Sequence, residues 1–243
     1  MIVACAAEGD DYAEHTATML RSLRAQHPDV QVHFLPTPGT PDLPGTTVHR
    51  IGDEHVAGLP TEGFTGKATW YRAFLPELLP EADRVLFLDS DLLVLQPLDE
   101  LWATDLEGSW VAAVENVFQP DHRHHPGRLG VRRYFNAGVL LMNLETMRAD
   151  GRTEALLEHG RTASYLPLRD QDALNVVLGE RRVALPARFN VMNAHHAFTP
   201  RWRHVRARRA PVIRHFEGPA HNKPWHPDAD PDARALWARF ATG

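Results

Sequence analysis

Four consecutive apolar residues, Val85 to Leu88, run directly into two aspartates, Asp89 and Asp91, that are separated by a single residue. An unbroken apolar run of this length is typical of a strand buried on both faces, as in parallel sheets. Because successive strand side chains point to opposite faces, we expect Asp89 and Asp91 to project the same way and Ser90 to turn aside. Two such carboxylates suit a divalent cation, although Asp-X-Asp also occurs as a turn or a helix cap. The surrounding sequence decides between these interpretations.

The N-terminal segment predicts a βαβ unit, which is the building block of nucleotide-binding sheets. An apolar strand at 2–6 precedes apolar residues at helical spacing over 13–23, and an alternating strand follows at 30–34. In open α/β sheets, ligands bind outside the carboxyl ends of the strands. The aspartates at 89 and 91 are therefore expected at a ligand-binding edge.

Further strands and helices follow along the chain and favour an α/β fold. A helix is expected at 69–79, interrupted by Pro76. The other expected strands lie at 110–114, 139–142, 183–185 and 212–216, and the other expected helices at 153–159, 171–178 and 233–240. The length of 243 residues favours a single domain.

The composition narrows the class of protein. Apolar residues make up 43% and charged residues 23% of the chain, which is near the average for globular proteins. Cys5 is the single cysteine, so an intrachain disulfide and a Cys-based zinc site are excluded and a cytoplasmic location is favoured. No apolar run approaches the length of a membrane span. The net charge of −5 does not suggest nucleic acid as the main partner.

Two polar segments have more than one interpretation. The basic run at 201–209 is either a solvated helix face or a peripheral contact with anionic lipid at the inner face of the membrane, or with a phosphorylated acceptor. The segment 117–133 is expected to be a variable loop of the kind that selects a substrate. Its acidic and histidine side chains belong either to a mobile lid or to an incidental polar loop, and they are Asp121, His122, His124 and His125.

Six ordered blocks, together spanning residues 2–226, carry a family resemblance. The blocks are the first strand with its acidic loop and Tyr12, Thr-Trp-Tyr-Arg at 69–72, Leu-Asp-Ser-Asp at 88–91, Tyr-Phe-Asn-Ala-Gly-Val-Leu-Leu-Met-Asn at 134–143, Asp-Gln-Asp at 170–172, and Ile-Arg-His-Phe-Glu-Gly-Pro at 213–219 with Lys-Pro-Trp at 223–225. On these motifs the chain resembles the family 8 glycosyltransferases. These are retaining, nucleotide-sugar-dependent enzymes that include glycogenin and bacterial lipopolysaccharide glucosyl- and galactosyltransferases.

The resemblance implies a GT-A fold, which is a single Rossmann-like α/β domain with a mixed, mainly parallel central sheet. Residues 1–115 would form the nucleotide-binding part and residues 116–243 the acceptor- and sugar-binding part. The resemblance also implies a manganese ion, held by Asp89, Asp91 and His215, that bridges the two phosphates of a UDP-sugar. Imidazole is intermediate between hard and soft ligands, so this set of side chains suits Mn²⁺ better than Mg²⁺, which is the alternative.

The other site residues follow from the same resemblance. Donor binding is expected from Ala6, Glu8, Asp11, Tyr12, Ser90, Gly218 and Lys223, of which Lys223 would reach the pyrophosphate as a point charge. The acidic loop is one residue longer than the family pattern, so Glu8 and Asp11 are both candidates for contacts with base and ribose. The catalytic residues expected around the diphosphate and the sugar are Arg72, Asn136, Asp170, Gln171 and Asp172. An exposed helix arginine is the alternative for Arg72, and a helix cap is the alternative for Asp172.

The predicted reaction moves glucose or galactose from a UDP-sugar to a hydroxyl of a saccharide, lipid-linked or small-molecule acceptor, and retains the anomeric configuration. Retention follows either from front-face attack guided by the leaving phosphate or from a covalent route through Gln171 or Asp172. Three alternatives are an inverting GT-A transferase, a UDP-sugar-binding module without turnover, and a self-glucosylating protein. The few tyrosines fall mostly inside the family blocks, which disfavours the last alternative. The sequence does not indicate an oligomeric state.

Overall fold

The computed structural model describes the whole chain except residues 63–65, 107, 118–128, 198–203 and 242–243. Most of the loop at 117–133, with its aspartate and histidines, lies outside the described residues, and so does the first part of the basic run at 201–209. Among the helices that are described, none combines the length and the apolarity needed to cross a membrane.

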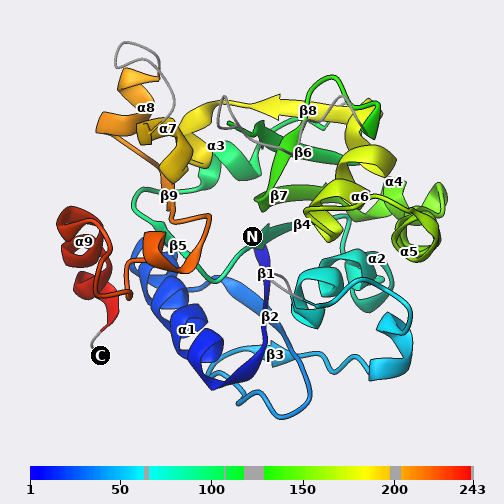
Figure 1. Cartoon of the computed structure of the whole chain (residues 1–243), viewed down its shortest axis with the longest axis horizontal. Coiled ribbons are helices and arrows are strands. Elements are labelled where there is room, and N and C mark those ends of the chain that lie inside the picture. Colours follow the sequence, from blue (N-terminus) through cyan, green and yellow to red (C-terminus); the bar gives the residue numbers. More distant parts are fainter. Residues whose placement is uncertain (63–65, 107, 118–128, 198–203, 242–243) are drawn as a thin grey trace.

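A mixed sheet forms the centre of the molecule and has seven strands within the described residues (Figure 1). In spatial order they are β3 (Thr47–Val48), β2 (Gln31–Pro36), β1 (Ile2–Ala7), β4 (Arg84–Leu88), β7 (Phe135–Asn143), β6 (Val111–Glu115) and β8 (Arg182–Leu185). β1 is parallel to β2 and β4, whereas β7 is antiparallel to its neighbours β4 and β6. The pairs β2–β3 and β6–β8 are parallel. The predicted mixed, mainly parallel α/β sheet is thus confirmed.

The helices lie close to their predicted positions with one exception. The α-helices are α1 (Gly9–Gln26), α2 (Leu75–Leu78), α3 (Asp99–Trp102), α4 (Leu144–Ala149), α5 (Arg152–Thr162), α6 (Asp170–Leu178), α7 (Asn193–Ala197), α8 (Val205–Arg209) and α9 (Pro231–Ala241), and the 3₁₀ helices are η1 (Asp53–Val56), η2 (Lys67–Phe74), η4 (Gly179–Arg181), η5 (Ala187–Phe189) and η6 (Ala220–Asn222). The interrupted helix expected at 69–79 is divided between Phe74 and Leu75 and not at Pro76, and its first part is the 3₁₀ helix η2. Pro76 is tolerated in the first turn of α2 but not in the interior of a longer α-helix.

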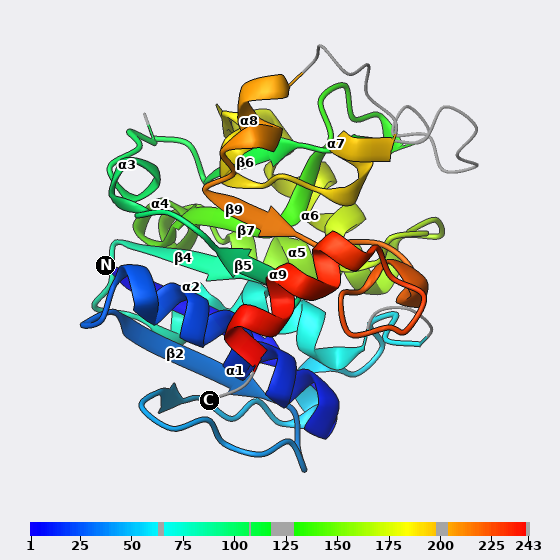
Figure 2. The same ribbon diagram turned by 90° about the vertical axis from the view of Figure 1, so that its left-hand side faces the viewer.

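The helices cover both faces of the sheet and produce three layers. α1 lies over one face, with α9 packed outside it against α1 and β5, and η2, α2, α4, α5 and α6 lie over the other face (Figures 1 and 2). The alternation along β1 shows how the sequence specifies this arrangement. Val3 and Cys5 pack in the apolar cluster on the α1 side, whereas Ala4 and Ala6 pack in the cluster on the η2 side.

The Asp-X-Asp segment connects the central sheet to a second, two-stranded sheet. The chain leaves β4 at Leu88, passes through three residues and enters β5 (Leu92–Val94), which pairs antiparallel with β9 (Ile213–His215). In this register Leu92 lies opposite His215. Figure 2 shows β5 and β9 in front of the central sheet, beside α9. The second sheet therefore carries His215 to a pair of aspartates that lie far away in the sequence.

Candidate functional site

Asp89, Asp91 and His215 come together just beyond the carboxyl end of β4. His215 Nε2 lies 3.0 Å from Asp91 Oδ1 and 4.0 Å from Asp89 Oδ2, and one ligand atom from each residue lies within 4.8 Å of the others. Neighbouring ligands of an octahedral ion with bonds of ~2.1 Å are ~3.0 Å apart, so these atoms are close enough to share one divalent cation. Among the residues that the structure describes, no other group of three or more Asp, Glu, His or Cys side chains is close enough to hold a metal ion. The residues present therefore fit the implied metal.

Lys223 forms an ion pair with the same aspartate. Its Nζ donates to Asp91 Oδ2, and the two side chains are only 12% and 11% exposed. Burial alone would raise the pKa of Asp91, but the charges of Lys223 and His215 and their hydrogen bonds outweigh it and hold this pKa well below its ordinary value. For Lys223 the effects have the opposite sign. Burial lowers its pKa and the charge of Asp91 raises it, and the pKa is raised overall. A carboxylate and an ammonium group are therefore both kept charged at the cluster.

Arg72 connects the cluster of Asp89, Asp91 and His215 to α6. Its Nη2 donates to Asp89 Oδ1 at 2.9 Å, its Nε lies 3.5 Å from Asp170 Oδ2, and its Nη1 donates to the carbonyl of Ala137. The guanidinium carbon lies 4.3 Å from the centre of the Phe87 ring, and the residue is only 3% exposed. The alternative of an exposed helix arginine is therefore wrong.

Asn136 and Gln171 are joined to each other and to the backbone of β7. Gln171 Oε1 accepts from the Ala137 N–H at 2.9 Å and from Asn136 Nδ2 at 3.2 Å. Asn136 Oδ1 accepts from the Gly138 N–H at 3.0 Å. A Cβ added to Gly138 would lie 2.2 Å from His215 Cε1, so the close backbone approach expected at this glycine is present.

Asn190 is a site residue that the sequence analysis missed. It is fully buried, and its amide lies between Asn136 Oδ1, at 2.8 Å, and His215 Nδ1, at 2.9 Å. The only local signal is a polar residue between the apolar Phe189 and Val191. That pattern does not reveal which side chains Asn190 meets.

The two aspartates at the start of α6 have different surroundings. Asp172 is fully buried, and its carboxylate accepts from the Leu168 N–H at 2.6 Å and from the Tyr134 hydroxyl. Asp172 thus binds the segment just before α6, but it is not the helix cap given as the alternative, because the N-cap residue is Arg169 and has no side-chain cap bond. Asp170 is 4% exposed, and burial raises its pKa to about 6 despite the opposing charge of Arg72.

The residues expected to bind the donor nucleoside surround the N-terminus of α1. Glu8 Oε2 accepts from the Ala68 N–H at 3.3 Å, and Asp11 is exposed in the first turn of the helix. Tyr12 is also exposed, at 43%. Ser90 does turn aside as predicted, because its hydroxyl donates to the Ala6 carbonyl at 3.0 Å. A direct contact of any of these residues with a ligand stays a prediction.

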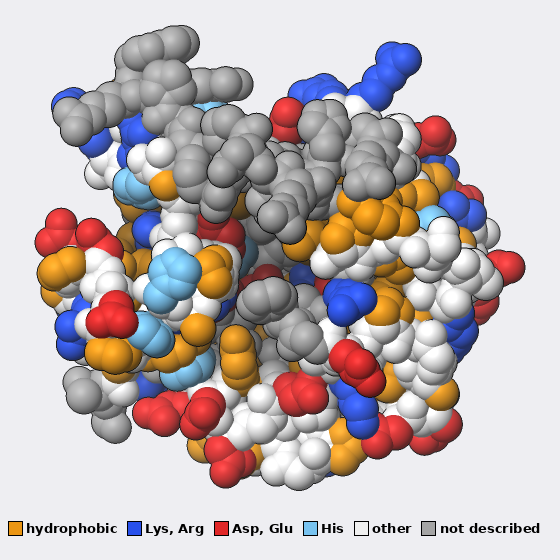
Figure 3. Space-filling model, viewed as in Figure 1, with side chains coloured by type: hydrophobic (Ala, Val, Ile, Leu, Met, Phe, Trp, Pro, Cys, Tyr) orange, Lys and Arg blue, Asp and Glu red, His pale blue; other side chains and the backbone are white. Residues whose placement is uncertain are grey.

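The segment that carries Lys223 packs against α1. Trp225 stacks on His15 with ring centroids 3.5 Å apart, and its ring meets Tyr12 edge-on at 6.3 Å. Gly218, which begins this segment, has a φ of +100°, a conformation that favours glycine. Figure 3 shows histidine side chains gathered on this face, beside α1 and the segment between β9 and α9. The ring contacts hold Lys223 close to the aspartates.

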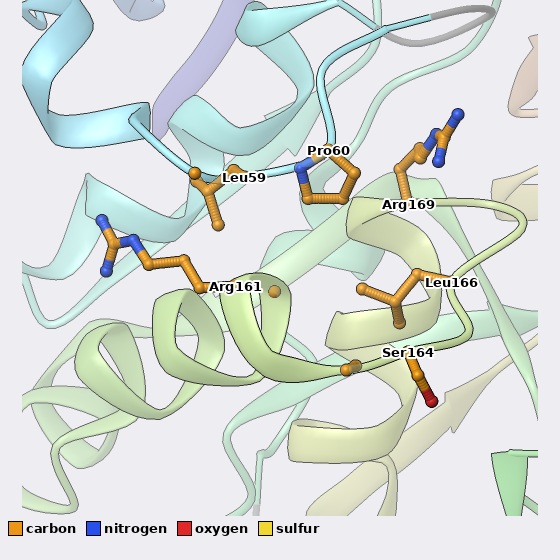
Figure 4. A pocket seen from close by; sticks show the side chains of 9 residues that line it. Leu59, Pro60, Arg161, Ser164, Leu166 and Arg169 are labelled. Carbon is orange, nitrogen blue, oxygen red and sulfur yellow. The ribbon is translucent and has the colours of Figure 1, made fainter.

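A hollow of about 330 Å³ lies between α5, the start of α6 and the loop that follows η1 (Figure 4). Arg161, which lines it, donates to the carbonyls of His55 and Ala57, and Arg169 donates to that of Glu62. These bonds tie the loop to the helices. None of the site residues expected from the sequence lines this hollow.

Comparisons with known proteins identify relatives of this chain. General stress protein A of Bacillus subtilis strain 168 is 28% identical over 93% of this chain and 87% of its own length. Lipopolysaccharide 1,2-glucosyltransferase of Escherichia coli K12 is 26% identical over 74% of this chain and 55% of its own length. The galactosyltransferase LgtC, solved in complex with donor and acceptor sugar analogs, has a TM-score of 0.85 and 28% identity, covering 99% of this chain and 95% of LgtC.

Some relatives are much longer than this chain. The chain spans only 22–41% of four glycosyltransferases of Streptococcus pneumoniae serotype 4, GlyA, GlyB, GlyD and GlyF. The model of glycosyl transferase family 8, by contrast, matches residues 6–229, which include every site residue described above. The chain therefore belongs to glycosyl transferase family 8 and is a glycosyltransferase with a GT-A fold.

Proposed function

We propose that the protein is a metal-dependent, retaining hexosyltransferase that moves glucose or galactose from a UDP-sugar to a hydroxyl acceptor. The observation that carries this proposal is the cluster of Asp89, Asp91 and His215 with the buried ammonium of Lys223 beside it. A leaving nucleoside diphosphate develops negative charge, and fixed positive groups in a buried site stabilise that charge.

The proposed division of labour follows from the contacts. Mn²⁺, or Mg²⁺ as the alternative, would be held by Asp89, Asp91 and His215, and when bound it supplies Lewis-acid stabilisation of the departing diphosphate. Lys223 contributes a second positive charge to the phosphates. Arg72 keeps Asp89 in place through a 2.9 Å bond and connects it to Asp170 on the expected sugar side.

Hydrogen bonding favours front-face attack over the covalent route. Gln171 Oε1 already accepts two hydrogen bonds, so both of its lone pairs are engaged. Asp172 is fully buried, with its carboxylate held by Leu168 and Tyr134. All three of these oxygens already accept hydrogen bonds, which disfavours the formation of a covalent bond to the sugar. We therefore propose that the leaving phosphate takes the acceptor proton, while Asn136, Asp170 and Gln171 orient the sugar.

The relatives support a carbohydrate acceptor. One is named a lipopolysaccharide glucosyltransferase, and LgtC was solved with an acceptor sugar analog. We propose a saccharide or lipid-linked glycan as the acceptor, with a small molecule as the alternative. A cytoplasmic site of action is proposed from the single, buried Cys5, with at most peripheral membrane contact.

A donor screen tests the reaction. We expect UDP release from UDP-glucose or UDP-galactose to exceed release from GDP- and ADP-sugars, to require Mn²⁺ or Mg²⁺, and to stop with a chelator. Proton coupling constants from NMR then give the configuration of the product. Retained configuration is expected, whereas inversion would support the inverting alternative. Metal-dependent donor binding without UDP release, with or without saccharide acceptors, would support the binding-module alternative.

Replacement of Asp170 should separate stability from activity. The pKa of Asp170 rises from 3.8 to about 6 on folding, so the folded state holds more protons than the unfolded state between about pH 4 and 6. Stability therefore falls as pH rises through this window. We expect Asp170→Asn to gain up to ~3 kcal/mol relative to wild type between pH 4 and 7, while turnover falls ~10²-fold. Urea unfolding across this pH range measures the first effect and UDP release the second.

Asp150→Asn is the matched control, at a carboxylate outside the site. A hydrogen bond from Trp110, together with Arg181, lowers the pKa of Asp150. Its contribution to stability is therefore present above its ordinary pKa and is lost as pH falls, which is the opposite sign. An Asp170→Asn variant that loses stability as pH rises from 4 to 7, relative to wild type, would contradict the assignment of Asp170.

A further inference from the structure

Asn190 links the metal cluster to the residues expected to bind the sugar. Its amide is fully buried and lies 2.9 Å from His215 Nδ1 on one side and 2.8 Å from Asn136 Oδ1 on the other. Asn136 in turn donates to Gln171 Oε1. A continuous chain of side-chain hydrogen bonds thus runs from the metal histidine to α6.

The backbone of β7 fixes the direction of every hydrogen bond in this series of side chains. The Gly138 N–H can only donate, so the atom of Asn136 that it meets at 3.0 Å must be the carbonyl oxygen. Because that oxygen only accepts, Asn190 must turn its NH₂ group toward Asn136 and its own oxygen toward His215. The Asn190 oxygen can only accept, so His215 Nδ1 must carry a hydrogen.

The same argument applies to Gln171, at the other end of this hydrogen-bonded series. The Ala137 N–H donates to Gln171 Oε1 at 2.9 Å, which makes Oε1 the acceptor for Asn136 Nδ2. The two amide assignments are mutually consistent. Two consecutive backbone N–H groups of one strand therefore orient three side-chain amides.

We propose that Asn190 is a positioning residue that holds the hydrogen of His215 on Nδ1, so that Nε2 alone faces Asp89 and Asp91 as a metal ligand. A ligating histidine commonly donates its other ring N–H to a fixed acceptor, which sets both the ring orientation and the ligating nitrogen. This inference rests on the proposed function in that it takes the cluster to bind a metal.

Packing against β7 and hydrogen bonding to Asn190 determine different properties of the His215 ring. A Cβ on Gly138 would lie 2.2 Å from His215 Cε1 and 2.9 Å from Nδ1, so the strand backbone lies against the ring and limits its tilt. That contact does not determine which ring nitrogen carries the hydrogen. Asn190, a neutral acceptor, keeps a hydrogen on Nδ1, so Nε2, which faces the carboxylate of Asp91, is the nitrogen left to bind a cation.

The test compares Asn190→Leu, which removes the acceptor, with Asn190→Asp, which keeps an acceptor toward Nδ1 but cannot donate to Asn136. We expect Mn²⁺ affinity, measured by titration calorimetry, to fall ~10–100-fold in Asn190→Leu. In Asn190→Asp we expect it to stay within about threefold of wild type, well short of the loss for a missing orienting group. Asn175→Leu is the matched control, because Asn175 is a buried amide that binds the backbone of Phe135 without touching the cluster. It should change stability but leave the affinity for Mn²⁺ unchanged.

NMR of histidine-¹⁵N-labelled protein gives a second readout. In the Mg²⁺-bound and the metal-free wild type, we expect a slowly exchanging Nδ1–H signal from His215, which persists in Asn190→Asp and disappears in Asn190→Leu. Equal Mn²⁺ affinity in folded Asn190→Leu and wild type, or a wild-type His215 without hydrogen on Nδ1, would overturn the inference. If Asn190→Leu does not fold, loss of the Nδ1–H signal in folded Asn190→Asp would overturn it.

The two proposals fail in different ways. If wild-type protein binds neither Mn²⁺ nor Mg²⁺, the metal assignment fails, yet the Nδ1–H signal of the metal-free protein still tests the role of Asn190. If the metal binds and the signal is absent, the role of Asn190 fails and the metal assignment stands.

Discussion

We expect Asp91→Asn to lower UDP-sugar turnover by ~10³-fold or more and to abolish its dependence on divalent metal. Asp91 is the carboxylate most deeply embedded in the cluster, with one oxygen 3.0 Å from His215 Nε2 and the other paired with Lys223. An amide of the same shape removes the negative charge that a cation requires. The measurement is steady-state UDP release at saturating donor, over a range of Mn²⁺ concentrations.

The same substitution leaves a buried ammonium group without its counter-charge. Breaking a buried pair by removing one partner typically costs ~3–5 kcal/mol, so Asp91→Asn should also lower the free energy of unfolding. The double variant Asp91→Asn/Lys223→Met removes both charges and should recover most of that stability without recovering turnover. Catalytic loss in this double variant, at near-normal stability, then shows that the Asp91–Lys223 pair serves the reaction and that the loss does not come from unfolding. Metal-dependent turnover that survives in Asp91→Asn, or wild-type turnover that survives in chelator, would show the metal assignment to be wrong.

The sequence predicted those parts of the fold that local pattern determines. The alternation of strand and helix over 2–34 fixes the βαβ unit, because each element has its own apolar period. The apolar run ending at Leu88 likewise predicts a buried strand that delivers Asp89 and Asp91 to a sheet edge, which is where the structure has them. Local periodicity was insufficient at 69–79, because eight residues are too few to distinguish the 3.0 residues per turn of a 3₁₀ helix from the 3.6 of an α-helix.

The contacts across the site depend on segments that are distant in the chain. His215 and Lys223 were assigned through the family resemblance, and their meeting with Asp91 requires the pairing of β5 with β9. β5 is only three residues long, too short for a periodic signal. The burial of Arg72 and the role of Asn190 had no local sign, because their partners belong to other elements.

Gly138→Ala should be the most damaging single-methyl change at the site. The added Cβ would lie 2.2 Å from His215 Cε1 and 2.9 Å from Asp89 Oδ2, so it would meet two of the three proposed metal ligands. His215 is 2% exposed and is held by Asn190 and Asp91, so it has little room to retreat. We expect Mn²⁺ affinity and turnover each to fall ~10²-fold or more, with a stability cost of ~1–3 kcal/mol from overpacking.

Calorimetric Mn²⁺ binding, UDP release and thermal unfolding measure these effects on one preparation, and Gly179→Ala provides the control. A Cβ at Gly179 meets nothing within 4 Å, and its backbone is already helical, so that variant should keep full activity and gain up to ~1 kcal/mol. If Gly138→Ala binds Mn²⁺ as tightly as wild type, the ring of His215 can move away from β7 while still acting as a ligand. The loss of metal affinity in a folded variant would instead mean that the strand backbone, which also orients Asn136 and Gln171, sets the positions of His215 and Asp89.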